Sequence, residues 1–479
     1  MRTICGIILV AAATFAGAGM SVLGEDIGVS GVHGYTPEGY VEVTDPAVKA
    51  NIERFRDMKL GLMMHFGIYS QVGIDESWPL VDTAIWRARQ MTDMGTGDDF
   101  KRNYWNLAKT FNPIRFDADA WARIAATNGF KYLCFTTKHH DGFSMFDTKY
   151  SDFKITSKDC PYSARANADM VRDIWDAFRR RGLAISCYFS KADWHHPDFW
   201  EDHGIGHETT WYPTYMPAEH PEKWARFETF LRNQMVELCR DYGRIEIMWL
   251  DGASVGCRHD TRVDMDGILA ECRKYQPWLI AADRRIKGPN EQLITPEQNV
   301  PEKPLACPWE SCITMASNWS YRYDDEYKSP KELIDILIRV VAKGGCLALN
   351  VAPRPDGVIP QPALERMNAM GDWLRVNGCA IYGTRPFPPY SVRNWCFTQR
   401  GGHYYAMRRT RPGERDIQQM VLNDEGENMK GWKMSRIVHV ASGAEIPFSK
   451  TPGGWLLELP QGFAADPYAD TFELFFVDE

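Results

Sequence analysis

Residues that could do chemistry stand where short apolar runs end. The run at 244–250 closes on Asp251, and burying a carboxylate there costs several kcal/mol, on the order of the penalty for an unpaired buried charge, unless it is paired or used. The other runs end in side chains that can form hydrogen bonds or carry a charge. They are His65, His139 with His140, Tyr188, and Asp283 with Arg284. A carboxylate beside histidines and aromatic rings suits acid–base or nucleophilic chemistry.

Glycoside hydrolysis fits this set, because it needs two carboxyl groups, about 5–5.5 Å apart for retention or roughly 6.5–9.5 Å apart for inversion. Glu297 and Glu310 are the candidates for the second carboxyl group. A purely structural reading also stays open, in which Asp251 forms a buried salt bridge with Arg284 or a lysine.

Metal chemistry is a weaker alternative. His139-His140 and His195-His196 are adjacent pairs, and neighbouring side chains point in different directions. No His or Cys set at helical spacing accompanies them, so we expect no metal and no cofactor. A metallohydrolase would instead lose its activity to chelators.

The elements that must position these residues alternate along the chain. The pattern predicts helices at 121–128, 169–178, 223–240 and 333–343. It predicts strands at 59–65, 131–137, 183–189, 244–250, 280–282 and 346–351. Nearly continuous apolar strands separated by helices indicate a parallel sheet, and we expect an α/β fold, a (β/α)8-like TIM barrel. A doubly wound open sheet is the alternative, but no glycine-rich phosphate motif follows an early strand. In a barrel, the strand ends listed above meet at one rim.

The sequence predicts three parts. Residues 1–25 have a short positive start and an apolar run, as in a signal peptide, which implies a secreted or periplasmic protein. Residues 26–384 form the expected catalytic barrel. From 385 to 479, Gly- and Pro-rich turns separate short alternating runs, which predicts a C-terminal antiparallel β-sandwich.

Composition excludes several classes of protein. The 479 residues are 44% hydrophobic and 25% charged, which is globular usage rather than that of a disordered chain. The net charge of −8 disfavours a nucleic-acid partner. After the N-terminal run no segment reaches 18 apolar residues, so no membrane span is expected. The oligomeric state, a homo-oligomer included, stays open.

Several motifs appear in an order that resembles one enzyme family. They are Met64-His65-Phe66-Gly67, Phe111-Asn112-Pro113, Thr136-Thr137-Lys138-His139-His140-Asp141-Gly142-Phe143, Tyr188-Phe189-Ser190, Trp249-Leu250-Asp251-Gly252, Pro308-Trp309-Glu310-Ser311-Cys312 and Leu349-Asn350-Val351-Ala352-Pro353. Over residues 45–385 the chain resembles the α-L-fucosidases of glycoside hydrolase family 29. The stretch from Thr136 to Phe143 is the most specific of these motifs.

The resemblance implies an exo-acting, retaining enzyme that removes α-linked L-fucose from a fucosylated oligosaccharide or glycoconjugate through a covalent glycosyl-enzyme. Asp251 would be the nucleophile and Glu297 the general acid and base, with Glu310 kept as the second candidate. The implied sugar-binding residues are His65, His139, His140, Tyr188, Arg284 and Trp319, with Trp78 and Glu310 added. Trp319 would pack against the C6 methyl group of fucose.

Two further alternatives stay open. One is a fucose-binding protein of the same fold with weak or no turnover. The other is a glycosidase whose preference has shifted to a different terminal sugar.

Overall fold

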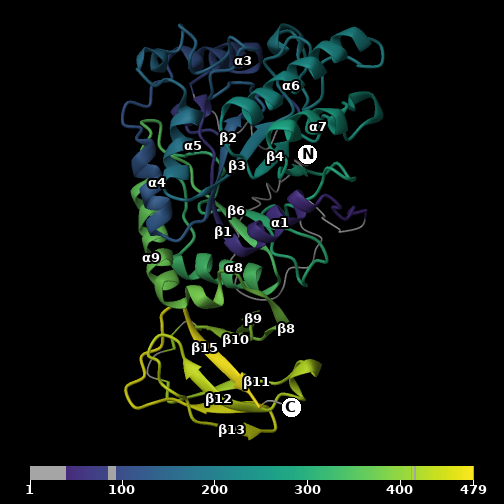
Figure 1. Ribbon diagram of the computed structural model, residues 1–479. Coiled ribbons are helices and arrows are strands. Elements are labelled where there is room, and N and C mark those ends of the chain that lie inside the picture. Colours follow the sequence, from purple (N-terminus) through teal and green to yellow (C-terminus); the bar gives the residue numbers. More distant parts are fainter. Residues whose placement is uncertain (1–38, 85–92, 412, 415–416, 478–479) are drawn as a thin grey trace, which may run out of the picture.

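The computed structural model describes residues 39–84, 93–411, 413–414 and 417–477. The expected signal peptide at 1–25 lies outside the described residues, so secretion stays a prediction. The described chain folds into two successive parts. A parallel sheet wrapped by helices comes first and antiparallel sheets follow it, as Figure 1 shows from top to bottom.

The first sheet has seven parallel strands in the order β5-β4-β3-β2-β1-β7-β6. The strands are β1 (Leu60–Met64), β2 (Tyr132–Lys138), β3 (Ala184–Ser190), β4 (Ile247–Asp251), β5 (Ile280–Asp283), β6 (Glu310–Thr314) and β7 (Cys346–Asn350). Almost every residue in them is buried, because helices cover one face and the curled sheet encloses the other. The expected α/β barrel architecture is confirmed.

The ring differs from eight regular strands in one place. The outer strands β5 and β6 do not pair with each other, and an irregular segment lies between them. Gln292 N donates to Ala281 O at 2.9 Å on the β5 side, and Glu310 N donates to Ile294 O at 2.8 Å on the β6 side. Further along, Glu297 pairs with Cys312 as an isolated parallel bridge. This segment takes the place of an eighth strand and carries Glu297 to the rim.

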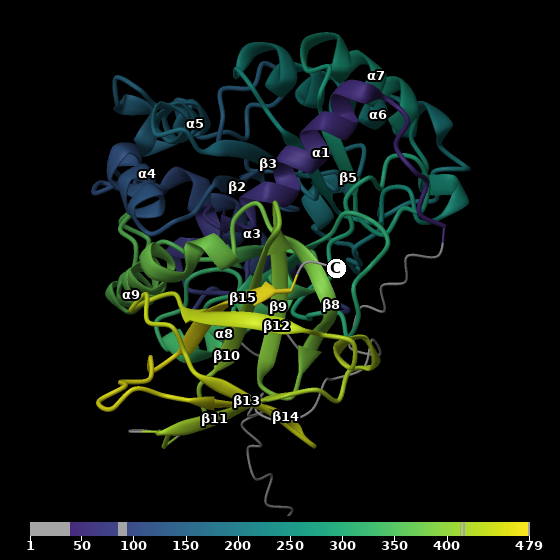
Figure 2. The same ribbon diagram turned by 60° about the horizontal axis from the view of Figure 1, so that its bottom comes forward.

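Helices cover the outside of the sheet, as Figures 1 and 2 show. They are α1 (Pro46–Met58), α3 (Gly97–Asn106), α4 (Ala118–Thr127), α5 (Met170–Arg180), α6 (Pro221–Asp241), α7 (Met265–Tyr275), α8 (Pro330–Ala342) and α9 (Gln361–Asn377). The four predicted helices correspond to α4, α5, α6 and α8. The capping box at Ser329 and Glu332 starts α8 as the sequence indicates.

Helix α1 closes the lower end of the barrel, which is the end where the strands begin. Its apolar side chains Val48, Ile52 and Phe55 join a cluster with inward-facing residues of the strands. Asn51 Nδ2 donates to the carbonyl oxygens of Glu246 and Trp278, which lie just before β4 and β5. The cavity described below lies at the opposite end, where the carboxyl ends of the strands meet.

The antiparallel strands begin at Arg385. One sheet has the order β12-β15-β10-β9-β8 and the other β11-β14-β13. The strands are β8 (Arg385–Val392), β9 (Trp395–Arg400), β10 (His403–Arg409), β11 (Gln419–Asn423), β12 (Met434–His439), β13 (Phe448–Thr451), β14 (Gly454–Glu458) and β15 (Ala469–Phe476). Trp395 and Phe472 from the first sheet share one core with Leu422 and Trp455 from the second. Two sheets packed face to face are the expected sandwich.

The sandwich is joined to the barrel by buried contacts. Trp373 of α9 donates from Nε1 to Ala469 O at 2.9 Å, and Thr398 Oγ1 donates to Ala380 O at 2.8 Å. Arg385 forms ion pairs with Glu53 and Asp57 of α1. None of these residues lines the cavity described below, so the sandwich supports the barrel from its closed end.

Among the described residues, no helix has the length and apolar character needed to cross a membrane. The eleven described cysteines are all free thiols. Cys134, Cys187 and Cys346 are fully buried within strands, where the sequence pattern predicts that each acts as a small apolar side chain.

Candidate active site

A cavity of about 420 Å³ lies where the strands β1 to β5 end. Its size is in the range of small-molecule sites. The expected site residues that line it are His65, Trp78, His139, His140, Tyr188, Asp251, Arg284, Glu297 and Trp319. Every residue of the expected set except Glu310 therefore meets at one rim, although the residues are spread over 255 positions of the sequence.

Asp251 ends β4 with its side chain 22% exposed, so a ligand in the cavity can reach it. Tyr188 donates its hydroxyl to Asp251 Oδ2 at 2.7 Å, and Arg284 donates from NH1 to Asp251 Oδ1 at 3.0 Å. Burial by itself would raise the pKa of Asp251, but Arg284, His140 and Tyr188 outweigh burial and hold this pKa well below its usual range. Asp251 is therefore a carboxylate at neutral pH, as a nucleophile must be.

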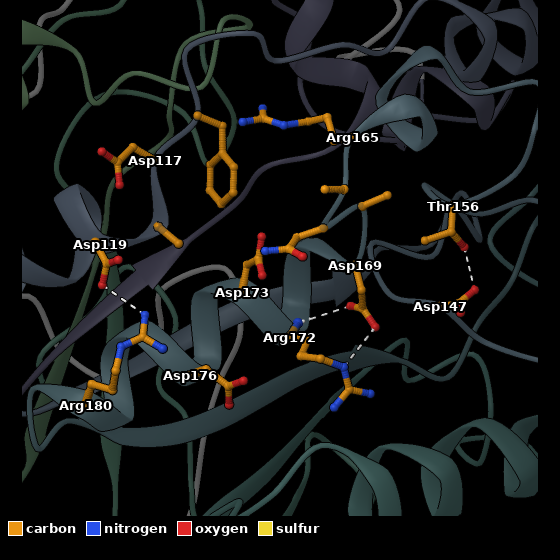
Figure 3. Close-up of a pocket in the computed structure, with 15 residues that line it drawn as sticks. Asp117, Asp119, Asp147, Thr156, Arg165, Asp169, Arg172, Asp173, Asp176 and Arg180 are labelled. Carbon is orange, nitrogen blue, oxygen red and sulfur yellow. Dashed lines mark hydrogen bonds and ion pairs between the residues drawn. The ribbon is translucent and has the colours of Figure 1, made fainter.

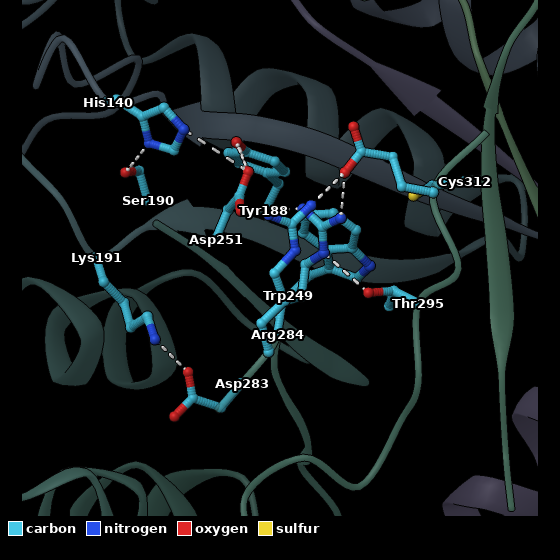
Figure 4. A network of polar contacts seen from close by, with 12 residues as sticks. His140, Tyr188, Ser190, Lys191, Trp249, Asp251, Asp283, Arg284, Thr295 and Cys312 are labelled. Atoms are coloured by element: carbon cyan, nitrogen blue, oxygen red, sulfur yellow. Dashed lines mark hydrogen bonds and ion pairs between the residues drawn. The ribbon is translucent and has the colours of Figure 1, made fainter. Parts of the chain in front are cut away.

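Arg284 joins the two expected catalytic carboxylates. Its NH2 donates to Glu297 Oε2 at 2.8 Å while NH1 holds Asp251, and Nε donates to Thr295 Oγ1 at 2.8 Å. The guanidinium also lies 4.3 Å from the centre of the Trp249 ring. The Arg284 side chain is only 6% exposed, and these contacts surround its planar guanidinium. Figure 4 shows Arg284 beside Trp249 and Thr295. Arg284 thus sets the spacing between Asp251 and Glu297.

Each of the three histidines at the cavity is oriented by a polar side chain next to its Nδ1. His65 Nδ1 lies 2.8 Å from Asn350 Oδ1, and the Asn350 amide donates in turn to Trp319 O. Burial lowers the pKa of His65 to about 4, so the ring is neutral. Because Asn350 Oδ1 is an acceptor, the proton of His65 lies on Nδ1, and Nε2 can accept a hydrogen bond from a ligand hydroxyl.

His139 and His140 are held in the same way. His139 Nδ1 lies 2.6 Å from Ser77 Oγ, and His140 Nδ1 lies 2.6 Å from Ser190 Oγ. The Ser190 hydroxyl donates to Ala192 O, so Nδ1 of His140 must be the donor to Ser190. His140 Nε2 then faces Asp251 Oδ2 at 3.8 Å, which Figure 4 also shows.

Glu310 lies beneath the cavity and does not line it. It begins β6 and is fully buried, with Oε2 accepting from Tyr132 at 2.5 Å and Oε1 accepting from Trp249 Nε1 at 3.0 Å. Trp249 does line the cavity, where it stacks on Tyr188 with ring centres 5.1 Å apart. Glu310 thus supports the floor of the cavity through Trp249, whereas Glu297 lines the cavity.

Burial raises the pKa of Glu310 to about 7, against the opposing hydrogen bonds from Tyr132 and Trp249. A folded-state pKa above the ordinary value of 4.5 means that the contribution of Glu310 to stability is fully present below pH 4.5. It is lost as the pH rises through about 7. Across that window, wild-type protein should lose about 3 kcal/mol of stability that a Glu310→Gln variant keeps. Thermal unfolding midpoints measured from pH 4.5 to 8 will check this, and equal pH dependence in the two proteins would contradict it.

The structure adds residues that the sequence patterns did not assign to the site. Glu76, Arg285, Trp249 and Trp211 also line the cavity. Glu76 is buried and its Oε1 accepts from Ser320 N at 3.1 Å, while Arg285 NH2 donates to Glu297 Oε2 at 3.1 Å. Glu76 and Arg285 both have positive φ angles, 42° and 64°, and such strain gathers at functional sites. In the sequence, Glu76 lies two residues before Trp78, and Arg285 follows Arg284 directly.

The histidines that follow β3 lie outside the cavity. His195 stacks on Phe153 with ring centres 3.8 Å apart and on His203 at 4.1 Å. Within the described part of the chain, no group of three or more His, Cys, Asp or Glu side chains has a metal-binding arrangement.

A larger hollow of about 970 Å³ lies between α4 and α5. Figure 3 shows that several of its charged side chains pair with one another, Asp119 with Arg180 and Asp169 with Arg172. None of the expected site residues lines it. The smaller cavity at the strand ends, where the titratable groups converge, is therefore the candidate active site.

Comparisons with known proteins identify a family and several relatives of this chain. A family model described as Alpha-L-fucosidase matches residues 33–379. The plasma α-L-fucosidase of Homo sapiens is 28% identical over 354 residues, 69% of this chain and 69% of that protein. The α-L-fucosidase of Dictyostelium discoideum is 26% identical over 452 residues, 88% of this chain and 91% of that protein.

Solved structures share the fold. Alpha-L-fucosidase isoenzyme 1 from Paenibacillus thiaminolyticus matches 90% of this chain and 100% of its own, with a TM-score of 0.73 and 27% identity. A family 29 α-L-fucosidase from Bacteroides thetaiotaomicron, solved as a trapped covalent intermediate, matches with a TM-score of 0.71 and 22% identity, covering 91% of this chain and 97% of its own. The latter likeness bears on the fold alone.

Proposed function

The chain belongs to the α-L-fucosidase family of glycoside hydrolases, and we propose that it is an exo-acting enzyme that removes terminal α-linked L-fucose with retention of configuration. The observation that carries this proposal is the Arg284 bridge. One buried guanidinium holds Asp251 and Glu297 at the same cavity, beside three oriented histidines.

In the first step, a carboxylate oxygen of Asp251 attacks the anomeric carbon of fucose. The bond from that carbon to the glycosidic oxygen breaks, and Glu297 gives its proton to the departing oxygen. The low pKa of Asp251 supports the nucleophilic role. In the second step, Glu297 takes a proton from water, the water oxygen attacks the same carbon, and the ester to Asp251 breaks. Two displacements at one carbon retain its configuration.

A small, largely apolar part of the cavity supports fucose as the terminal sugar. Trp319 lies beside His65, with ring centres 5.3 Å apart, and Cys312 and Met63 also line the cavity. A C6 methyl group packs against such surfaces, whereas a C6 hydroxyl would lose its hydrogen bonds there. His65 Nε2 offers an acceptor to a sugar hydroxyl on the same side.

The closed lower end of the barrel supports exo action. Trp249 and Tyr188 form the floor of the cavity and Glu310 lies below it, so a sugar chain cannot pass through. We propose fucosylated oligosaccharides or glycoconjugates as substrates, without a cofactor. The positive start and apolar run within residues 1–25 support a secreted or periplasmic location.

The test is hydrolysis of 4-nitrophenyl α-L-fucoside followed by NMR from the first seconds. Retention predicts that α-L-fucose forms first and that the β anomer grows in later by mutarotation. An initial β anomer would mean inversion. Absence of hydrolysis by folded protein that still binds fucose would point to a binding protein, and faster cleavage of another glycoside would indicate a shifted sugar preference.

A further inference from the structure

Trp211 is an aromatic side chain at the cavity that the proposed mechanism does not use. It comes from the long connection between β3 and α6, and it is only half-buried. Its described ring neighbours are Trp78, tilted by 40° with ring centres 6.5 Å apart, and Tyr212, which meets it edge-on. Neither of these two rings lies flat against the indole of Trp211, and the side chain lines the cavity.

Trp211 stands one ring further from the nucleophile than Trp78 does. The Trp78 ring meets His140, with centres 5.4 Å apart, and His140 faces Asp251. Trp211 packs on the side of Trp78, and the neighbouring wall of the cavity consists of Val81, Thr83 and Ala84. A single sugar bound at Asp251 would reach Trp78, and the unit attached to that sugar would reach Trp211.

A buried group of hydrogen bonds and one ion pair holds the loop of Trp211 against the loop of Trp78. Thr209 Oγ1 donates to Leu80 O at 2.7 Å, and Thr209 N donates to Asp82 Oδ2 at 2.9 Å. Lys101, which is 2% exposed, binds Asp82 Oδ2 at 2.7 Å and the carbonyl oxygens of Gly204 and His207. The ammonium thus ties both loops together, and Trp211 is positioned before a ligand arrives.

Arg285 marks the side from which the leaving group departs. Its guanidinium contacts Glu297, the proposed acid for the leaving oxygen, and the Arg285 side chain is 36% exposed. Trp211 and Arg285 line the same cavity, which thus offers an aromatic ring and hydrogen-bond donors to a group on that oxygen. A pyranose ring suits both, because its faces carry C–H groups and its edge carries hydroxyl oxygens.

We propose that Trp211 is the stacking surface of a leaving-group subsite, and that the group bound there is a pyranose linked directly to the terminal fucose. This inference rests on the proposed function and specifies its substrate class. Binding energy from this second sugar lowers the barrier for the first chemical step, because the sugar is held while its bond to fucose breaks.

The experiment compares two kinds of leaving group on the same sugar. The first substrate is α-L-fucosyl fluoride, whose leaving group is one atom. The second is the fucosyl disaccharide that wild-type enzyme cleaves best, chosen from α-1,2, 1,3, 1,4 and 1,6 linkages. Trp211→Ala should lower kcat/KM about tenfold on the disaccharide, the scale of one lost aromatic contact, and leave kcat/KM on the fluoride unchanged.

Two variants control for folding and for the loop. Trp211→Phe keeps an aromatic face and should recover most of the lost kcat/KM on the disaccharide. Met216→Ala removes an exposed side chain of the same loop and should match wild type on both substrates. An equal loss on both substrates, or no loss on either, would overturn the leaving-group subsite. If wild type cleaves neither substrate, the proposed function itself fails and the subsite with it.

Discussion

Replacing Asp251 with alanine should lower kcat on an aryl α-L-fucoside by at least about 10⁴-fold, the scale seen when an enzyme loses its nucleophile. The reason is geometric. Asp251 is the carboxylate that Tyr188 and Arg284 hold ionised at the cavity, and the described cavity wall has no other carboxylate at the end of a strand. Steady-state kinetics on purified variant and wild type will measure the loss.

Azide should restore turnover to Asp251→Ala. The missing side chain leaves room for this small anion, which can attack the anomeric carbon and displace the aryl group, forming β-L-fucosyl azide. NMR of the product will identify the inverted configuration. Asp260→Ala, on the loop after β4 and outside the cavity, serves as the matched control and should keep wild-type activity. Failure of azide rescue in a folded, inactive Asp251→Ala protein would place the nucleophile elsewhere.

Glu297→Ala should show the second large effect, and its size should depend on the leaving group. With a fucosyl disaccharide, whose leaving oxygen needs a proton, kcat/KM should fall by about 10²–10⁴-fold, the usual contribution of a general acid. With α-L-fucosyl fluoride, which needs little help to leave, kcat/KM should change far less. The measurement is a plot of log kcat/KM against leaving-group pKa, which should be steep for the variant and shallow for wild type.

Variants of two other glutamates serve as controls for the assignment of Glu297 as the general acid. Glu302→Ala removes an exposed carboxylate of the same connection and should behave as wild type. Glu310→Gln should remove the loss of stability that wild type shows as the pH rises, and it should not steepen the leaving-group dependence, because Glu310 lies beneath Trp249. A steep dependence in the Glu310 variant and a shallow one in the Glu297 variant would exchange their roles.

The choice between Glu297 and Glu310 shows a limit to predicting the position of a site residue from sequence patterns. Glu310 follows Trp309 in a family-like motif, yet it begins β6, with its side chain facing the barrel interior. Glu297 lies in an irregular stretch with no strand periodicity, and its isolated bridge to Cys312 carries it to the rim. Periodicity detects regular elements, and so it could not locate a residue on an irregular closing segment.

The same limit explains the residues that were missed. Strand β6 was not predicted, because its residues Glu310–Thr314 mix polar and apolar side chains without alternation. Trp211 and Arg285 lie on connections, and connections are placed by their contacts with other loops rather than by local pattern. For Trp211 those contacts come from Lys101 and Asp82, more than a hundred positions earlier in the chain.

The sequence alone determined the alternation of buried strands and amphipathic helices, the change to short antiparallel strands near 385, and the strand ends on which Asp251, the histidines and Tyr188 stand. These features follow from local periodicity and from the cost of ending an apolar run on a charged group. Only the tertiary structure decided that Arg284 bridges Asp251 to Glu297, that Glu310 lies below the floor, and that Trp211 faces the cavity. These are contacts between distant segments, and their geometry is set by how the ring closes between β5 and β6 and by how the loops above it pack.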